Sequence, residues 1–148
     1  MDDTFKCDVP GDPEEFAGSA VVLVGGALGS GPELLRAFAA RGAKVAIGVT
    51  SAEDAAHAAS VARAYGVACL PVDTDDEAEV ERFFDACMER LGGLDILVNV
   101  AAPVSTADAL DIHAARYRDV IARELVGPIL CIQAAARRMK ERGGGRIV

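Results

Sequence analysis

Short apolar runs alternate with amphipathic helical patterns along most of this chain. The apolar runs are rich in Val, Ile and Leu, and each is predicted to form a strand: residues 20–24, 44–49, 67–72 and 94–98, with 146–148 opening a fifth. Strands that alternate with helices over short connections predict a parallel sheet with right-handed crossovers. The expected fold class is therefore α/β, a doubly wound parallel sheet truncated at the start of its fifth strand.

The stretches between these runs carry apolar residues at helical spacing. Helices are predicted over residues 32–41 and 53–65, and a third follows the capping residues 73–76 and continues to about Leu91. One face of this third helix collects Val80, Phe83, Phe84 and Cys87. The pattern predicts that each helix packs on the sheet through such a face.

A longer helical stretch is predicted from residue 111 to about 142. Gly127-Pro128 interrupts it, because proline lacks the N–H that a continuing helix needs. The apolar side of this stretch consists of Val120, Ile121, Leu125, Ile129 and Ile132. We expect apolar helix faces to remain partly uncovered here, and the fourth strand to keep a largely unpaired edge.

A glycine-rich turn joins the first strand to the first helix. Gly25, Gly29 and Gly31 follow the apolar run, and Pro32 suits the first helical turn. Glycine adopts positive φ and has no Cβ, so the backbone can approach a pyrophosphate closely, and the helix N-terminus favours negative charge. An ordinary βα turn can also be rich in glycine, but this order of strand, turn and helix favours a dinucleotide site.

Composition limits the other possibilities. The 148 residues suit one domain, which we place at residues 18–148 after an acidic mobile tail over residues 1–17. A net charge of -8 argues against nucleic acid and anionic membranes as partners. The N-terminus shows no signal-peptide pattern and no run is long enough to span a membrane, so a cytoplasmic location is expected.

Cysteine and histidine indicate neither a metal site nor catalysis. The four cysteines are widely separated and form no Cys-x-x-Cys pair, so three of them are expected to be buried free thiols. His57 and His113 are isolated in the sequence and are expected on helix surfaces. We therefore assign no catalytic or metal-ligating residue.

Taken in order, these segments resemble the short-chain dehydrogenase/reductase family from about residue 16 to 148. The Gly-x-x-x-Gly-x-Gly turn stands at the family's spacing, Leu97–Ala102 occupies the place of its Leu-Val-Asn-Asn-Ala-Gly motif, and residues 139–148 match its entry into the fifth strand. The resemblance implies a Rossmann fold that binds NAD or NADP, with Asp73 where the family contacts adenine. The implied cofactor contacts are Gly25, Ala27, Leu28, Gly29, Ser30, Gly31, Thr50, Ser51, Asp73, Thr74, Asn99, Val100 and Ala101.

The choice between NAD and NADP is weakly encoded. An acidic residue after the second strand would bind the ribose of NAD, and an arginine nearby would pair with the 2′-phosphate of NADP. The chain has Thr50 and Ser51 there, which exclude neither cofactor. We expect either to bind, with a slight preference for NADP.

Several positions depart from the family pattern. Val24 replaces the threonine before the first glycine, Val100 and Ala102 replace the second asparagine and the glycine of the Asn-Asn-Ala-Gly motif, and Glu124 aligns with the asparagine of the proton relay. The sequence also contains no Tyr-x-x-x-Lys, the motif that supplies the family's general acid.

Three functions remain open. The chain can be the cofactor-binding half of an oxidoreductase that transfers hydride between a nicotinamide and a carbonyl or alcohol. It can instead be a non-catalytic dinucleotide-binding or interaction module, or an inert remnant. In each case we expect a homo-oligomer, or a partner chain that covers the exposed sheet edge.

Overall fold

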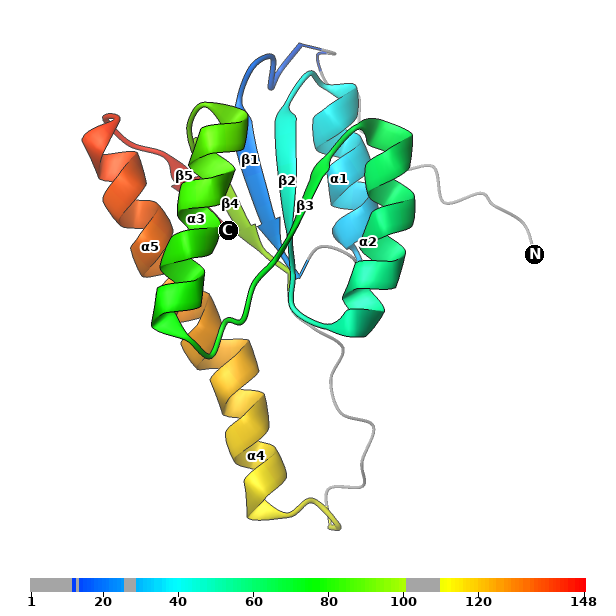
Figure 1. The fold of residues 1–148 in the computed structure, drawn as a ribbon, viewed down its shortest axis with the longest axis vertical. Coiled ribbons are helices and arrows are strands. Elements are labelled where there is room, and N and C mark those ends of the chain that lie inside the picture. The colour runs from blue at the N-terminus through cyan, green and yellow to red at the C-terminus, as the bar shows by residue number, and fades with distance from the viewer. Residues whose placement is uncertain (1–11, 13, 26–28, 101–109) are drawn as a thin grey trace, which may run out of the picture.

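The computed structural model describes residues 12, 14–25, 29–100 and 110–148 and shows a parallel sheet between two layers of helices (Figure 1). The elements are β1 (Ala20–Val24), α1 (Gly31–Ala40), β2 (Lys44–Val49), α2 (Ala52–Tyr65), β3 (Ala68–Pro71), α3 (Glu77–Leu91), β4 (Ile96–Asn99), α4 (Ala114–Ile121), the π-helical turn η1 (Ala122–Val126), α5 (Gly127–Glu141) and β5 (Arg146–Ile147). In the described residues, five parallel strands have the order β3-β2-β1-β4-β5. The predicted doubly wound α/β fold is confirmed.

The sheet separates two hydrophobic cores, because successive side chains of a strand point to opposite faces. On one face, Val21 and Leu23 of β1 belong to the same cluster as Leu35 of α1. On the other, Val22 belongs to a cluster with Phe84 of α3 and with residues of α5. All five of these side chains are fully buried, and because β1 is covered on both faces it is apolar throughout.

The outer strand on one side is β5 rather than β4. Ile96 and Leu97 of β4 pair with Arg146 and Ile147, and the Asn99 N–H donates to the Val148 carbonyl at 2.8 Å. The expectation that the fourth strand keeps a largely unpaired edge is therefore wrong. Residues 146–148 occupy that edge and are themselves exposed.

The long helical stretch divides at η1. The interruption predicted at Gly127-Pro128 takes the form of a π-helical turn over the five preceding residues, and α5 continues directly from Gly127. In Figure 1, α4 extends beyond the edge of the sheet, and no residue of α4 is buried. Single π-helical turns inside α-helices frequently occur at functional sites, so this junction bears on the site described below.

The large apolar side chains of this stretch do not face the core. α5 buries mostly small residues, Gly127, Cys131, Ala134 and Ala135, together with Met139. The exposed fractions of the larger apolar residues are 52% for Ile121, 55% for Leu125, 42% for Ile129 and 37% for Ile132. The expectation that apolar helix faces remain partly uncovered agrees with this arrangement.

Residues 14–18, which the sequence analysis divides between tail and domain, lie against the end of α1. The Phe16 N–H donates to the Arg41 carbonyl at 3.1 Å, and the Gly18 N–H donates to the Gly42 carbonyl at 3.0 Å. The Phe16 ring also meets the Phe38 ring edge-on, with centroids 4.9 Å apart. Most of the acidic tail predicted before these residues lies outside the described part of the chain.

Candidate functional site

The predicted cofactor contacts gather at one edge of the sheet, where the parallel strands have their carboxyl ends. Gly25 follows β1, Thr50 and Ser51 follow β2, Asp73 comes two residues after β3, and Asn99 ends β4. Open parallel sheets bind ligands at this edge, where the strand order reverses. Three predicted contacts, Ala27, Leu28 and Ala101, lie outside the described residues.

Gly25 requires glycine for two independent reasons. Its φ is +73°, a region that other residues rarely adopt. A Cβ at this position would lie 2.7 Å from the carbonyl oxygen of Val100, which is closer than any ordinary contact. The turn after β1 therefore passes directly against the chain that leaves β4.

Backbone hydrogen bonds hold this crossing in place. The Gly25 N–H donates to the Gly48 carbonyl at 3.0 Å, and the Val100 N–H donates to the Val24 carbonyl at 2.9 Å. Val24 itself is buried. The hydroxyl that the family's threonine would supply at position 24 is absent, but the backbone bond still ties β1 to the chain after β4.

The start of α1 has the features of an anion-binding turn. Gly29 has a φ of +58°, and a Cβ built on it would meet nothing within 4 Å among the described residues. Ser30 is the exposed N-cap residue but makes no side-chain capping bond, and the first helical positions are Gly31, which is buried, and the half-buried Pro32. No described residue closes this end of α1 on the side of Gly29, and its N–H groups favour a negatively charged group.

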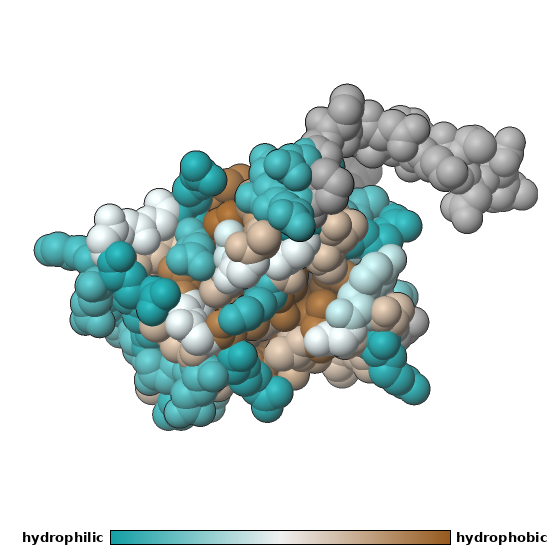
Figure 2. Space-filling model, turned by 90° about the horizontal axis from the view of Figure 1, so that it is seen from above, coloured by the Kyte–Doolittle hydropathy of each residue, from teal (hydrophilic) through white to brown (hydrophobic). Residues whose placement is uncertain are grey.

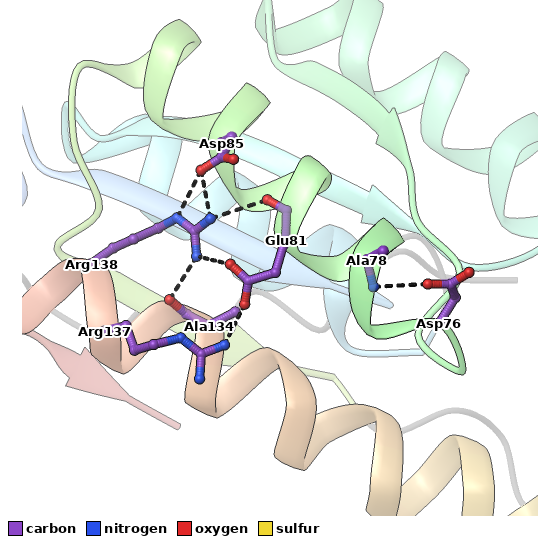
Figure 3. Close-up of polar contacts among 7 residues, drawn as sticks. All are labelled: Asp76, Ala78, Glu81, Asp85, Ala134, Arg137 and Arg138. Atoms are coloured by element: carbon purple, nitrogen blue, oxygen red, sulfur yellow. Dashed lines mark hydrogen bonds and ion pairs between the residues drawn. The ribbon is translucent and has the colours of Figure 1, made fainter.

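The loop between β3 and α3 carries the predicted adenine contacts. It begins where the Val72 N–H donates to the Val49 carbonyl at 2.9 Å. The exposed Asp73 accepts a hydrogen bond from the Asp75 N–H at 3.0 Å. Asp76 then caps α3 by accepting from the N–H groups of Ala78 and Glu79, at 2.8 and 3.2 Å. Figure 3 shows the first of these capping bonds.

Asn99 presents a buried acceptor at the same edge. Its side-chain Oδ1 has no hydrogen-bond partner within the described part of the chain. Side chains alternate along β4, so Asn99 lies on the same face as Leu97, the face covered by α3 and α5. An unpaired buried acceptor costs free energy, so this position suits a donor group from a bound molecule.

Two glycines that help to shape the site were not among the predicted contacts. A Cβ on Gly48 of β2 would lie 2.8 Å from the Phe83 ring, and one on Gly127 would lie 2.8 Å from the Thr74 side chain. Gly48 could have been found as a glycine inside an apolar strand, which often marks a close approach. For Gly127, the sequence predicts only a helix interruption.

Residues with acid–base chemistry are spread apart. Glu124, on η1, is exposed, and so is Tyr117 on α4. Tyr65 lies at the opposite, amino edge of the sheet, where it lines a groove of about 510 Å³ together with Lys44 and Arg90. Figure 2 views the molecule from this edge and shows apolar surface framed by polar residues. The groove is therefore separate from the carboxyl edge.

Cys87 and Cys131 are buried and both histidines are exposed, as expected, whereas Cys69 is not fully buried. Burial raises the pKa of the Cys87 thiol to about 12 and that of Cys131 to about 11, so both stay protonated and unreactive. Cys69 is partly buried, and desolvation also raises its pKa. His57 is exposed on α2, and His113 is exposed at the start of α4.

Comparison with known proteins gives consistent results. The family model described as short chain dehydrogenase matches residues 19–148. Cis-4-hydroxycyclohexanecarboxylate dehydrogenase of Sinomonas cyclohexanicum is 39% identical over 140 residues, covering 91% of this chain and 55% of that protein. L-rhamnose 1-dehydrogenase (NAD(P)(+)) of Azotobacter vinelandii is 35% identical over 135 residues, covering 86% of this chain and 53% of that protein.

A solved structure agrees with these relatives. A short-chain type dehydrogenase/reductase from Mycobacterium marinum superposes with a TM-score of 0.78 at 29% identity, covering 91% of this chain and 56% of that one. The chain thus spans about half the length of the relatives it matches. The glycine turn, the strand order and the match over residues 19–148 together show that the chain belongs to the short-chain dehydrogenase family.

Proposed function

We propose that this chain is the dinucleotide-binding portion of an NAD(P)-dependent oxidoreductase that interconverts alcohols and carbonyl compounds. The observation that carries the proposal is the crossing of Gly25 and Val100, where a Cβ would lie 2.7 Å from a carbonyl oxygen. This crossing brings the glycine turn and the end of β4 together beside the N-terminus of α1. Such a backbone arrangement suits a pyrophosphate and its attached riboses.

Each part of the dinucleotide has a proposed set of contacts. The N–H groups at the start of α1, with Gly29 and Ser30, would hold the pyrophosphate. Asp73 and Thr74 would contact the adenine, and Asn99 and Val100 would lie beside the nicotinamide ribose. When bound, the nicotinamide supplies the hydride-transfer chemistry. The described residues bind and orient this group.

Binding of NADPH and NADH to the 148-residue chain, measured by fluorescence titration and by protection against thermal unfolding, tests the proposal. We expect saturable binding of at least one cofactor, with NADPH slightly tighter because Thr50 and Ser51 place no carboxylate at the end of β2. Failure of both cofactors to bind would overturn the proposal.

The substrate class rests on the relatives. Those compared above are named for dehydrogenation of a hydroxylated carboxylic acid and of a sugar. We propose a hydroxylated compound and its ketone or aldehyde for the whole protein. A version of the chain extended beyond residue 148 should oxidise such alcohols with NAD(P), and an extended version that binds cofactor but oxidises none would contradict this part.

A non-catalytic dinucleotide-binding module is the second candidate. Glu124 on η1 favours it, because a carboxylate there puts charge where the family has a neutral amide. In this case the extended version binds cofactor and remains inactive, and restored turnover in Glu124→Asn would assign the inactivity to this carboxylate. Turnover by the unaltered extended version would instead support the first candidate.

We further propose that the protein is a cytoplasmic homo-oligomer without nucleic-acid or membrane partners. The exposed apolar residues of α4, η1 and α5 form a continuous stripe at helical spacing: Ile121, Leu125, Ile129 and Ile132. No helix in the described part of the chain is long and apolar enough to cross a membrane. Light scattering should show a dimer or larger species, and Leu125→Glu should dissociate it. A monodisperse monomer would contradict the proposal.

A further inference from the structure

α5 begins directly against the loop that follows β3. Gly127 is buried at the first position of α5, and a Cβ built on it would lie 2.8 Å from both the Cβ and the Oγ1 of Thr74. The Thr74 carbonyl oxygen would be 3.3 Å away. Gly127 has ordinary helical angles, φ -55° and ψ -51°, so its conformation does not require glycine. The close approach to Thr74 is what requires it.

α5 is fixed and cannot move away from this contact easily. Arg138, whose side chain is 13% exposed, pairs with Glu81 at 2.9 Å and with Asp85 at 2.5 Å, both on α3. Arg137 pairs with Glu81 as well, as Figure 3 shows. The Arg138 guanidinium also lies 5.8 Å from the centre of the Phe84 ring. Together with the buried face of α5, these contacts hold the two helices in one relative position.

The loop is the more yielding partner. Asp73, Asp75 and Asp76 are exposed, and beyond the anchored Val72 two hydrogen bonds of the loop are short-range: Asp73 accepts from Asp75, and Asp76 donates its N–H to the Asp73 carbonyl at 3.4 Å. A larger residue at position 127 would therefore displace Thr74 and its neighbours rather than the helix.

We propose that Gly127 is a positioning residue for dinucleotide binding, because it lets α5 seat against Thr74 and hold the β3–α3 loop where Asp73 receives the adenine. The inference rests on the proposed function, since it takes Asp73 and Thr74 as adenine contacts. It adds a residue that touches no part of the cofactor and acts through Thr74. The same contact connects the adenine end of the site to η1, which carries Glu124.

The test compares Gly127→Ala with Gly93→Ala. A Cβ on Gly93 would also make a close contact, 2.7 Å from the guanidinium of Arg142. This group is the end of a flexible side chain and lies at the opposite edge of the sheet, so it can move away. We expect Gly127→Ala to raise the Kd for NADPH and NADH by at least about tenfold, and Gly93→Ala to leave it within about twofold. Equal effects of the two variants would overturn the inference.

Two further measurements separate positioning from general loss of structure. Gly127→Ala should reduce the affinity for 2′-phospho-ADP-ribose and ADP-ribose, which contain the adenine, by the same factor as the affinity for the whole dinucleotides. In the Thr74→Gly background, which removes both close atoms, Gly127→Ala should cost far less affinity. Unchanged ADP-ribose binding in Gly127→Ala, or an equal cost in both backgrounds, would contradict the inference.

The unaltered chain provides a test that does not depend on any variant folding. Dinucleotide should slow amide hydrogen exchange in residues 73–76 and at the same time in residues 126–130. Protection confined to 73–76 would overturn the inference. Failure of the unaltered chain to bind any dinucleotide would instead overturn the proposed function, so the two failures are distinguishable.

Discussion

Replacing Gly25 by alanine should destabilise the protein more than the same change at Gly29. Both residues have positive φ, +73° and +58°, so an alanine at either position carries the cost of the left-handed conformation, about 1–2 kcal/mol. Only Gly25 faces a second penalty, since its Cβ would lie 2.7 Å from the Val100 oxygen, whereas Gly29 has no described neighbour within 4 Å.

The second penalty can be estimated from the nature of the contact. The Val100 oxygen belongs to the backbone, and the Val100 N–H is bonded to the Val24 carbonyl, so relief of the contact requires a shift of the backbone rather than of a side chain. Overpacking of this kind costs about 1–3 kcal/mol. We therefore expect a loss of about 2–5 kcal/mol for Gly25→Ala and about 1–2 kcal/mol for Gly29→Ala in the free energy of unfolding.

Urea unfolding of the two variants, followed by circular dichroism, measures this difference. A gap of at least about 1 kcal/mol corresponds to roughly 3 °C in Tm for a chain of this size, so thermal scans serve as a check. Both variants should also bind dinucleotide more weakly, because each alters the turn at the pyrophosphate. Equal destabilisation by the two variants would refute the argument that the crossing with Val100 requires glycine.

Other predictions concern the α3–α5 contact and the core. Arg138→Met should lower the free energy of unfolding by about 1–3 kcal/mol, because its carboxylate partners lose a donor, whereas Arg82→Met, in an exposed pair, should change it by less than about 0.5 kcal/mol. Urea titrations measure both losses in free energy of unfolding, and equal losses in the two variants would contradict this prediction. The hydrogen bond from Arg137 is the main cause that lowers the pKa of Glu81 below 4.5, so the ion pair stabilises the fold above that pH and stabilises it less as the pH falls. The difference in free energy of unfolding between the unaltered chain and Glu81→Gln should therefore narrow from about pH 5 to pH 3. A difference that widens over this range would contradict the prediction. A thiol reagent should modify Cys87 only as the chain unfolds, and modification in native buffer as fast as in urea would contradict its burial.

Much of the fold follows from local sequence, but two features of the site do not. Pattern and turn chemistry predict β1, the glycine turn and the cap at Asp76, each of which depends on residues close in sequence. Gly48 and Gly127 owe their roles to Phe83 and Thr74, which lie far away along the chain. A single sequence does not reveal such partners, because a close approach depends on how whole helices seat on the sheet.

The sequence by itself determined the α/β class, the order of the elements and which glycines turn the chain. Every described residue with positive φ is a glycine, as expected when local sterics decide the conformation. The tertiary structure alone decided that α5 buries its small residues and leaves Ile129 and Ile132 exposed. Periodicity identifies an apolar face, but which side chains are buried depends on how α5 packs against α3 and β4. The pairing of β4 with residues 146–148 was decided in the same way, because strand pairing joins segments about 50 residues apart through backbone bonds that no local pattern encodes.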